Sequence, residues 1–157
     1  MVLASIPPEI AIVGSLEILS DPEMWICDTG ASNHSTFSKL GNSAERPSNT
    51  QSQGISGPAR KAESEIDLPS IICDRFGNEL TEVKLTEVAY KGDSNFNLFS
   101  VGRCLINGWT LSGDAEHIQL SKGGVDIKFD IVIRTAKGAL LCCMIKRSQG
   151  FVQSHDW

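Results

Sequence analysis

A single aspartate, Asp28, stands where an apolar run ends and a run of small residues begins. Residues 25–27 precede it and residues 29–32 follow it, so that the stretch reads WICDTGAS. The apolar run predicts a strand, and Asp close to Gly is typical of the turn that ends a strand. Such a turn can hold a carboxylate at a surface, where it can take a proton from water as a general base.

The triplet Asp28-Thr29-Gly30 is also a common structural turn, so its surroundings have to decide between the two interpretations. Residues 25–34, WICDTGASNH, resemble the active-site loop of retropepsin-like aspartic proteases. They have every fixed residue of the form W-x-x-D-[ST]-G-A-S-x-H, which is similar to the copia-type branch of long-terminal-repeat retrotransposons. The resemblance implies that Asp28 is catalytic and that the active-site loop is supported by Thr29, Gly30, Ala31 and Ser32.

Two later stretches follow in the order that this family requires. Residues 53–57, QGISG, resemble the glycine-rich flap hairpin over the substrate, which implies substrate-binding roles for Gly54, Ile55, Ser56 and Gly57. Residues 97–105, NLFSVGRCL, resemble the strand, glycine and short helix behind the catalytic loop, with Val101, Gly102 and Arg103 closing the core. The resemblance extends over roughly residues 23–146.

The chain departs from the family in two places. Viral relatives often have an acidic residue at the position of Ser32, so an ion pair from this position to Arg103 is not available here. Ser100 and Val101 stand where two bulky aliphatic residues are usual. Neither departure affects Asp28.

The chemistry of this family needs two carboxylates that face each other across a water molecule. Two such groups cannot both ionise, so they share one proton and titrate as a unit. The ionised carboxyl takes a proton from water, and the protonated one supports the peptide carbonyl oxygen. The chain has one D-[ST]-G motif. The second carboxylate is therefore expected from Asp28 of a second copy, on the axis of a symmetric homodimer.

The resemblance also implies roles for the residues around Asp28. The Thr29 hydroxyl would bond across the dimer axis, and Gly30 would let the substrate backbone approach because it has no side chain. The flap near Ile55 would close over the substrate and exclude water. The ends of the chain would pair between subunits.

The pattern of the chain predicts an all-β fold. Short apolar runs rich in Ile, Val and Leu are separated by Gly-containing turns at spacings of about ten residues, which is typical of a barrel or sandwich. The runs are residues 9–19, 24–27, 66–73, 80–90, 95–101, 117–120, 125–134 and 139–146. In residues 125–134, alternation predicts one shared face for Val125, Ile127, Phe129 and Ile131. One helix of about two turns is predicted near residues 101–109, ending at Gly108. Residues 42–53 are polar and predict an exposed loop or the base of a hairpin.

The composition excludes several classes. The 157 residues fit one domain, the net charge is −5, and no run is rich in Lys or Arg, which argues against direct nucleic-acid binding. The five cysteines form no CxxC pair and no zinc-type spacing, so we expect reduced, mostly buried thiols, no metal and no cofactor. Because Cys142 and Cys143 are adjacent, one of the two could be exposed on a strand. We expect no signal peptide, no membrane contact, and a location in the cytoplasm, including virus-like particles.

Other residues have competing interpretations. His34 could be a ligand or a base, but a hydrogen-bonded structural histidine is preferred, and His117 and His155 are interpreted as surface residues. Cys27 could be a nucleophile, but no Cys/His pairing supports this, so a buried strand thiol is the default. Arg103 is expected to brace the loop below the site through backbone carbonyls or an acid. Trp25 and Trp109 are expected in the core.

The sequence therefore predicts a retropepsin-like closed β-barrel of the acid protease fold, with one short helix, completed as a homodimer. Residues 1–22 would be an N-terminal strand or linker that could join the dimer interface, residues 23–147 the protease domain, and residues 148–157 a tail. The predicted function is an aspartic endopeptidase that processes a retrotransposon Gag-Pol polyprotein. The alternatives are a catalytically decayed dimeric peptide-binding module, a host protease of the same type, and a plain β-barrel interaction domain.

Overall fold

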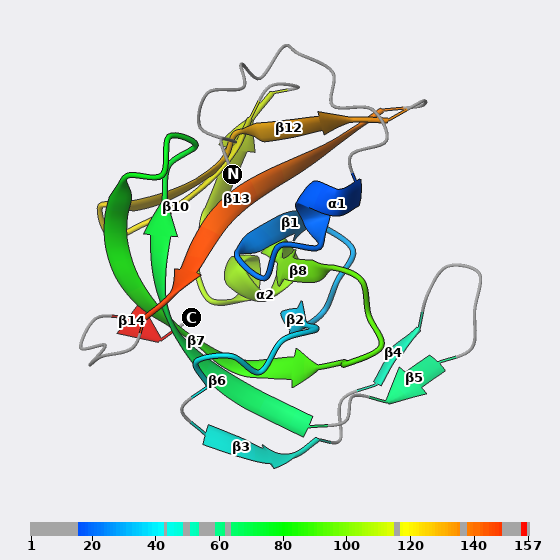
Figure 1. The fold of residues 1–157 in the computed structure, drawn as a ribbon. Helices are drawn as coiled ribbons and strands as arrows, with labels where there is room; N and C mark the ends of the chain where they lie inside the picture. Colours follow the sequence, from blue (N-terminus) through cyan, green and yellow to red (C-terminus); the bar gives the residue numbers. More distant parts are fainter. Residues whose placement is uncertain are drawn as a thin grey trace.

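The computed structural model of the chain describes residues 16–42, 44–48, 51–53, 59–61, 64–114, 117–135, 138–148 and 155–156. Within these residues the fold is mostly β-strand, with two short helices, as Figure 1 shows. The helices are α1 (Leu16–Leu19) and α2 (Val101–Ile106). The predicted all-β class is confirmed, and α2 is the short helix that the sequence predicted at this place.

The strands follow one another along the whole described chain. They are β1 (Met24–Asp28), β2 (Ser35–Thr36), β3 (Ala44–Pro47), β4 (Gln51–Gln53), β5 (Ala59–Lys61), β6 (Ser64–Cys73), β7 (Glu79–Tyr90), β8 (Asn97–Ser100), β9 (Thr110–Gly113), β10 (Ile118–Lys122), β11 (Val125–Phe129), β12 (Ile131–Arg134), β13 (Ala139–Arg147) and β14 (His155–Asp156).

Six of these strands close into a barrel. The main sheet has the order β12-β13-β1-β8-β2-β7-β6-β3, and an additional pairing of β13 with β6 joins its two sides. The long antiparallel strands β6 and β7 form one wall, which curves around the barrel in Figure 1. Strands β9, β10 and β11 make a separate three-stranded sheet, and β4 pairs with β5. A closed barrel confirms the predicted architecture at this level.

Strand β1 lies in the interior of the sheet, between partners that are distant in the sequence. It runs parallel to β8, with Asp28 opposite Ser100, and antiparallel to β13, with Ile26 opposite Cys142. Its residues Met24, Trp25 and Ile26 are all buried, because both faces of the strand are covered. The barrel therefore fixes the position of the strand that ends at Asp28.

Two apolar clusters lie on the two faces of this sheet. The larger cluster joins the barrel strands to α2 and to the three-stranded sheet; it comprises Trp25, Ile66, Leu68, Ile72, Val83, Leu85, Val88, Phe99, Val101, Cys104, Trp109, Leu120, Ile127, Phe129, Cys143 and Ile145. The smaller one lies on the other face and comprises Ile18, Leu19, Met24, Ile26, Ile131, Ile133 and Cys142. The core positions predicted for Trp25 and Trp109 are confirmed.

Two predictions are wrong because of the smaller cluster. Residues 16–19 form a helical turn rather than part of a strand, and this turn places Ile18 and Leu19 on β1. The predicted strand over residues 125–134 is divided at Asp130, so that Ile131 lies in the smaller cluster while Ile127 and Phe129 lie in the larger one. A strand that changes sheets cannot keep one continuous face.

Cys142 and Cys143 show the same effect. They point to opposite faces of β13, as expected, but both are buried because each face has its own apolar cluster. All five thiols are free, and Cys27 is the one that is half-buried. The expectation that one of the adjacent pair could be exposed is therefore wrong.

The polar region over residues 42–53 is more regular than an exposed loop. Residues of β3 pair with β6, and β4 pairs with β5, with Gln53 opposite Ala59. The alternative prediction of a hairpin base is the better description. None of the described helices is long and apolar enough to cross a membrane.

Candidate active site

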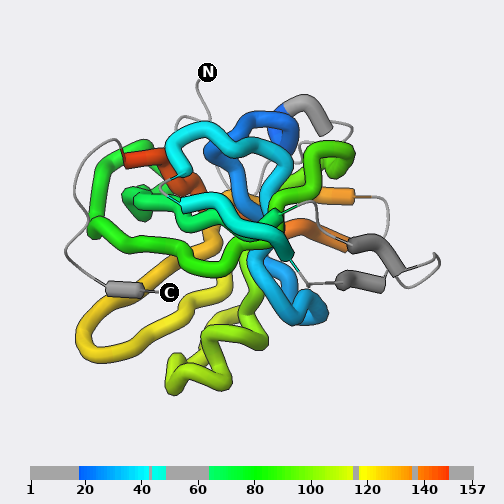
Figure 2. The backbone as a smooth tube through the Cα atoms, turned by 90° about the horizontal axis from the view of Figure 1, so that it is seen from below, coloured from blue at the N-terminus to red at the C-terminus, as the bar shows by residue number. Residues whose placement is uncertain are grey.

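Asp28 ends β1 at a surface of the barrel. Its side chain is partly exposed, and the next two residues, Thr29 and Gly30, are exposed. Figure 2 shows the loop after β1 in blue beside the yellow-green helix α2 on one side of the molecule. The sequence predicted this placement from the change from apolar to small residues.

The loop holds the Asp28 carboxylate with two backbone groups. The N–H of Gly30 donates to Oδ1 at 2.8 Å, and the N–H of Ala31 donates to the same oxygen at 3.1 Å. Two donors on one oxygen orient the carboxylate and leave Oδ2 for another partner. A Cβ atom at Gly30 would lie 3.4 Å from Oδ1, so the absence of a side chain keeps this side of the carboxylate open.

Ser100 connects this loop to the helix behind it. Its Oγ donates to the carbonyl oxygen of Ala31 at 2.6 Å and accepts the N–H of Arg103 at 3.1 Å, as the N-cap of α2. Gly102 lies directly beneath, where a Cβ atom would be 3.6 Å from the same Ala31 oxygen. Serine in place of a bulky aliphatic residue thus forms a direct link from α2 to the loop.

His34 lies in the interior behind the loop. Its side chain is fully buried, and its Nδ1 accepts the N–H of Ser100 at 2.9 Å. Its ring contacts the ring of Phe99 with 4.5 Å between centroids. Burial, together with the positive charge of Arg103, lowers the pKa of His34 to about 3, so the ring is neutral at ordinary pH. The expected hydrogen-bonded histidine is confirmed, although its partner could not be read from the sequence.

Asn97 is a supporting residue that sequence reasoning missed. It is buried at the start of β8, where its Oδ1 accepts the Thr36 hydroxyl at 2.6 Å. Its Nδ2 donates to the carbonyl oxygens of Pro22 and Met24 at 3.0 and 3.1 Å. The segments before and after the Asp28 loop are thereby tied to β8. The available signal was an amide residue at the start of an apolar strand, since such a residue needs partners when buried.

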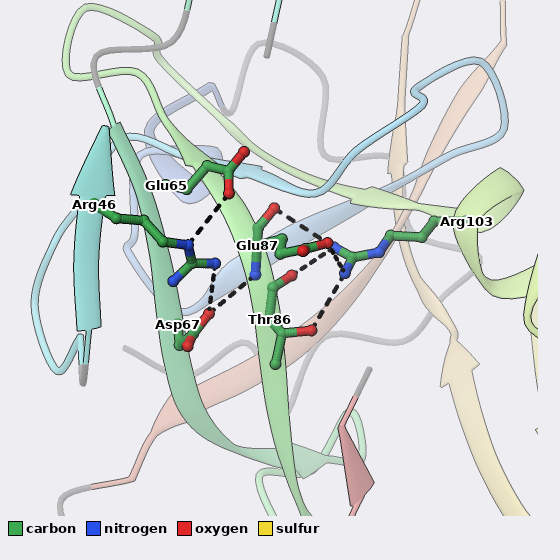
Figure 3. A network of polar contacts seen from close by, with 6 residues as sticks. All are labelled: Arg46, Glu65, Asp67, Thr86, Glu87 and Arg103. Carbon is green, nitrogen blue, oxygen red and sulfur yellow. Dashed lines mark hydrogen bonds and ion pairs between the residues drawn. The ribbon is translucent and has the colours of Figure 1, made fainter. Parts of the chain in front are cut away.

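Arg103 braces strand β7 instead of bonding to the Asp28 loop itself. Its guanidinium donates to the carbonyl oxygen of Thr86, to the Thr86 hydroxyl at 3.2 Å and to the Glu87 carboxylate at 3.2 Å. Figure 3 shows these contacts. The expected backbone carbonyl and the unidentified acid are therefore both on β7.

The same network continues across the barrel wall. Glu87 has a φ of 53°, which is unusual for a residue with a side chain, and its N–H donates to Asp67 at 3.0 Å. The pairing of β6 with β7 shifts register between Ile66 and Leu68, which identifies a β-bulge at this place. Arg46 on β3 contacts Asp67 at 3.2 Å and Glu65 at 3.4 Å, as Figure 3 also shows.

The comparisons with known proteins do not assign a family. No protein-family model matches the chain, and neither a curated protein nor a solved structure matches it. The interpretation of the site therefore depends on its residues and geometry.

Cys27, next to Asp28, is a poor nucleophile in this environment. Burial, together with the negative charge of Asp28, raises the pKa of its thiol to about 12. The reactive form of a cysteine is the thiolate, which this environment disfavours. The structure thus favours the strand-thiol interpretation.

No metal-binding cluster of three or more His, Cys, Asp or Glu side chains occurs within the described ranges. His117 is partly exposed and lies 3.5 Å from the Asp114 carboxylate. The side chain of His155 lies outside the described residues.

The predicted flap residues Gly54, Ile55, Ser56 and Gly57 lie outside the described residues. The strands on either side of them are described, and they pair as an antiparallel hairpin, β4 with β5. At the other end of the chain, β14 pairs with β7 of the same chain, whereas the resemblance implies pairing of the chain ends with a second copy.

Proposed function

We propose that this protein is an aspartic endopeptidase of the retropepsin type, which hydrolyses peptide bonds with a pair of Asp28 carboxylates, one from each subunit of a homodimer. The observation that carries the proposal is the parallel pairing of β1 with β8. This pairing sets Asp28 opposite Ser100 and places the exposed loop over Gly102 and the start of α2.

The geometry of the loop suits water activation. One oxygen of Asp28 is held by the Gly30 and Ala31 amides, while the carboxylate remains partly exposed. A fixed orientation of the carboxylate is needed for proton transfer to and from a bound water molecule. The open side at Gly30 allows the backbone of a peptide substrate to come close.

The second carboxylate has to come from another copy of the chain. The other residues of the Asp28 loop that face solvent, Thr29, Gly30 and Ser32, are uncharged. A symmetric dimer places the same loop twice at one axis, so the two Asp28 carboxylates share a proton there. The exposed Thr29 hydroxyl is then available to bond across the axis.

The substrate proposed is the Gag-Pol polyprotein of a copia-type retrotransposon. This part of the proposal rests on the match of residues 25–34 to the copia-type pattern. The products would be the separate coat, protease, integrase and reverse transcriptase parts. In this proposal the chain cleaves a longer precursor of which it is itself a part.

The test is cleavage of a mixed peptide library by the purified chain near pH 5, over a series of protein concentrations. We expect a rate that rises faster than linearly with concentration, because the monomer is inactive. Asp28→Asn abolishes cleavage, since an amide cannot accept the proton from water. Asp126→Asn is the matched control, because Asp126 is exposed on β11 and is not part of the Asp28 loop.

A mixing experiment tests the sharing of the site. Excess Asp28→Asn chain added to the wild type forms hybrid dimers with one carboxylate, so activity falls by more than dilution explains. Activity that is unaffected by the variant would contradict the shared site. A folded, dimeric chain that cleaves nothing would overturn the proposed function and favour the peptide-binding module.

A further inference from the structure

The fully buried ring of His34 has no role in the proposed chemistry, and its two nitrogens differ. Nδ1 accepts the N–H of Ser100 at 2.9 Å. Nε2 is buried without a hydrogen-bond partner. A nitrogen that accepts an N–H cannot itself have a proton, so the ring is the neutral tautomer with its proton on Nε2.

A continuous chain of hydrogen bonds leads from this ring to Asp28. The ring accepts from the Ser100 N–H, and the Ser100 hydroxyl donates to the Ala31 carbonyl at 2.6 Å. The N–H of Ala31 in turn donates to Oδ1 of Asp28 at 3.1 Å. These hydrogen bonds fix each group relative to the next. Ser100 is also held by the parallel pairing of β8 with β1.

We propose that His34 is a positioning residue for Asp28: its unprotonated Nδ1 fixes the Ser100 peptide, and through the Ser100 hydroxyl it sets the place of the loop that holds the carboxylate. The kinetic part of this inference rests on the proposed function, whereas the structural part does not. His34 Nδ1 thus has a specific positioning role, in addition to the packing of the ring in the core.

Two features of its environment keep the ring of His34 in the orientation and protonation state that this role needs. Its packing against Phe99 limits rotation of the ring, so Nδ1 stays directed at Ser100. Burial and the charge of Arg103 lower the pKa of the ring to about 3, which keeps Nδ1 free to accept throughout the acidic range in which aspartic proteases act. An ordinary exposed histidine would be protonated near pH 5 and would lose the bond.

Three substitutions separate positioning from packing. His34→Asn keeps an acceptor oxygen at the place of Nδ1, although it is smaller and leaves a cavity. His34→Gln puts its amide oxygen near the place of Nε2, and His34→Leu has no acceptor. A packing role favours the larger Gln and Leu side chains over Asn, whereas the positioning role favours Asn.

The first readout is hydrogen exchange of the Gly30 and Ala31 amides, measured on each folded variant. We expect exchange about tenfold faster or more in His34→Leu and His34→Gln, and within about threefold of the wild type in His34→Asn. The amides of Ser121 and Asp126, which pair in the three-stranded sheet and do not belong to the larger cluster that contains Phe99, serve as internal references and should not change. Nitrogen-15 spectra should show the Nε2-protonated neutral ring at pH 5.

The second readout is steady-state cleavage at a protein concentration that saturates the dimer. His34→Leu and His34→Gln should lose about 100-fold in kcat with little change in KM, because a misplaced carboxylate affects the chemical step. His34→Asn should restore most of kcat.

The outcomes are distinguishable. If the wild type cleaves nothing, the proposed function fails, while hydrogen exchange still decides whether His34 positions the loop. If the wild type cleaves and all three variants behave alike in exchange and in kcat, the positioning inference fails and the protease remains. A ring protonated on Nδ1 at pH 5 also overturns the inference. If His34→Leu does not fold, the comparison of His34→Asn with His34→Gln still tests it.

Discussion

Two polar networks flank the Asp28 loop, and they differ in burial and charge. The first is neutral and buried: it joins His34, Ser100 and Asn97 to the backbone around β1. The second is charged and lies nearer the surface, between Arg46 on β3 and Arg103 on α2 (Figure 3). In the second, the Glu87 side chain is 65% exposed, whereas His34 and Asn97 are fully buried.

The difference shows which network holds the site. A buried polar group that loses its partner has no water to replace it, so it bears the full cost of desolvation. An exposed ion pair is surrounded by water, and its attraction is weak and screened by salt. We therefore expect the neutral network to determine the geometry of the Asp28 loop. The charged network should contribute less, by holding α2, β7, β6 and β3 together. Four measurements on variants of these residues test this difference between the two networks.

The largest effect should be in the pH dependence of stability. The folded pKa of His34, about 3, lies below its usual 6.5, so between these values the unfolded state binds a proton that the folded state does not. This contribution is complete above pH 6.5 and is lost as the pH falls toward 3, at about 1.4 kcal/mol per pH unit. His34→Asn removes it.

Urea unfolding of the wild type and His34→Asn at pH 7, 5.5 and 4 measures this, at one protein concentration because the proposed dimerisation would also add stability. The wild type should lose more stability than the variant as the pH falls. Parallel losses in the two proteins would show that His34 is not held neutral by burial.

Asn97→Ala should lower the free energy of unfolding by about 3 kcal/mol, because it removes the buried amide that accepts from the Thr36 hydroxyl and donates to two carbonyl groups. The matched control is Asn95→Ala, two residues earlier and exposed, with an expected change within about 0.5 kcal/mol. Thermal and urea unfolding would both report the difference. Equal losses in the two variants would remove Asn97 from the neutral network.

Arg103→Met should lower the free energy of unfolding by about 1–2 kcal/mol. The loss is smaller than that from Asn97→Ala because water can replace Arg103 at the exposed Glu87 carboxylate. Water reaches the Thr86 carbonyl less easily, so part of the loss remains. Arg134→Met, on β12 and exposed, is the control and should change stability by under about 0.5 kcal/mol. A loss from Arg103→Met larger than that from Asn97→Ala would reverse the order of the two networks.

The smallest effect is expected at the outer end of the charged network. Arg46→Met should lower the free energy of unfolding by about 0.5 kcal/mol, and this difference should shrink further in 1 M salt. Measurement at low and high salt, with Lys128→Met on the exposed side of β11 as control, checks it. A large, salt-independent loss would indicate that Arg46 is structurally coupled to the bulge at Glu87.

The parts of the fold that could be predicted are those with local causes. The strand predicted over residues 24–27, observed as Met24–Asp28, was visible because apolar residues run into Asp28, and helix α2 because Gly follows its end. The Asp28 turn was visible from Gly30 and the small residues after it. These features depend only on residues that are close to one another in the sequence.

The errors have a non-local cause. The helical turn at residues 16–19 and the division at Asp130 depend on a second apolar cluster behind the sheet, which forms from segments at both ends of the described chain. The same cluster buries Cys142. Periodicity alone shows that a strand has two faces, but it cannot show that both faces will be covered.

The sequence by itself determined that Asp28 ends a strand at a turn, that the chain is mostly β, and that one copy supplies one such aspartate. Each of these follows from residue types and their immediate spacing. Only the tertiary structure decided that β13 would lie beside β1, that Ser100 would reach the Ala31 carbonyl, and that His34 would be buried with Nδ1 as an acceptor. The physical reason is that these contacts join residues 66 or more positions apart in the chain, and closure of the barrel is what brings them within hydrogen-bond distance.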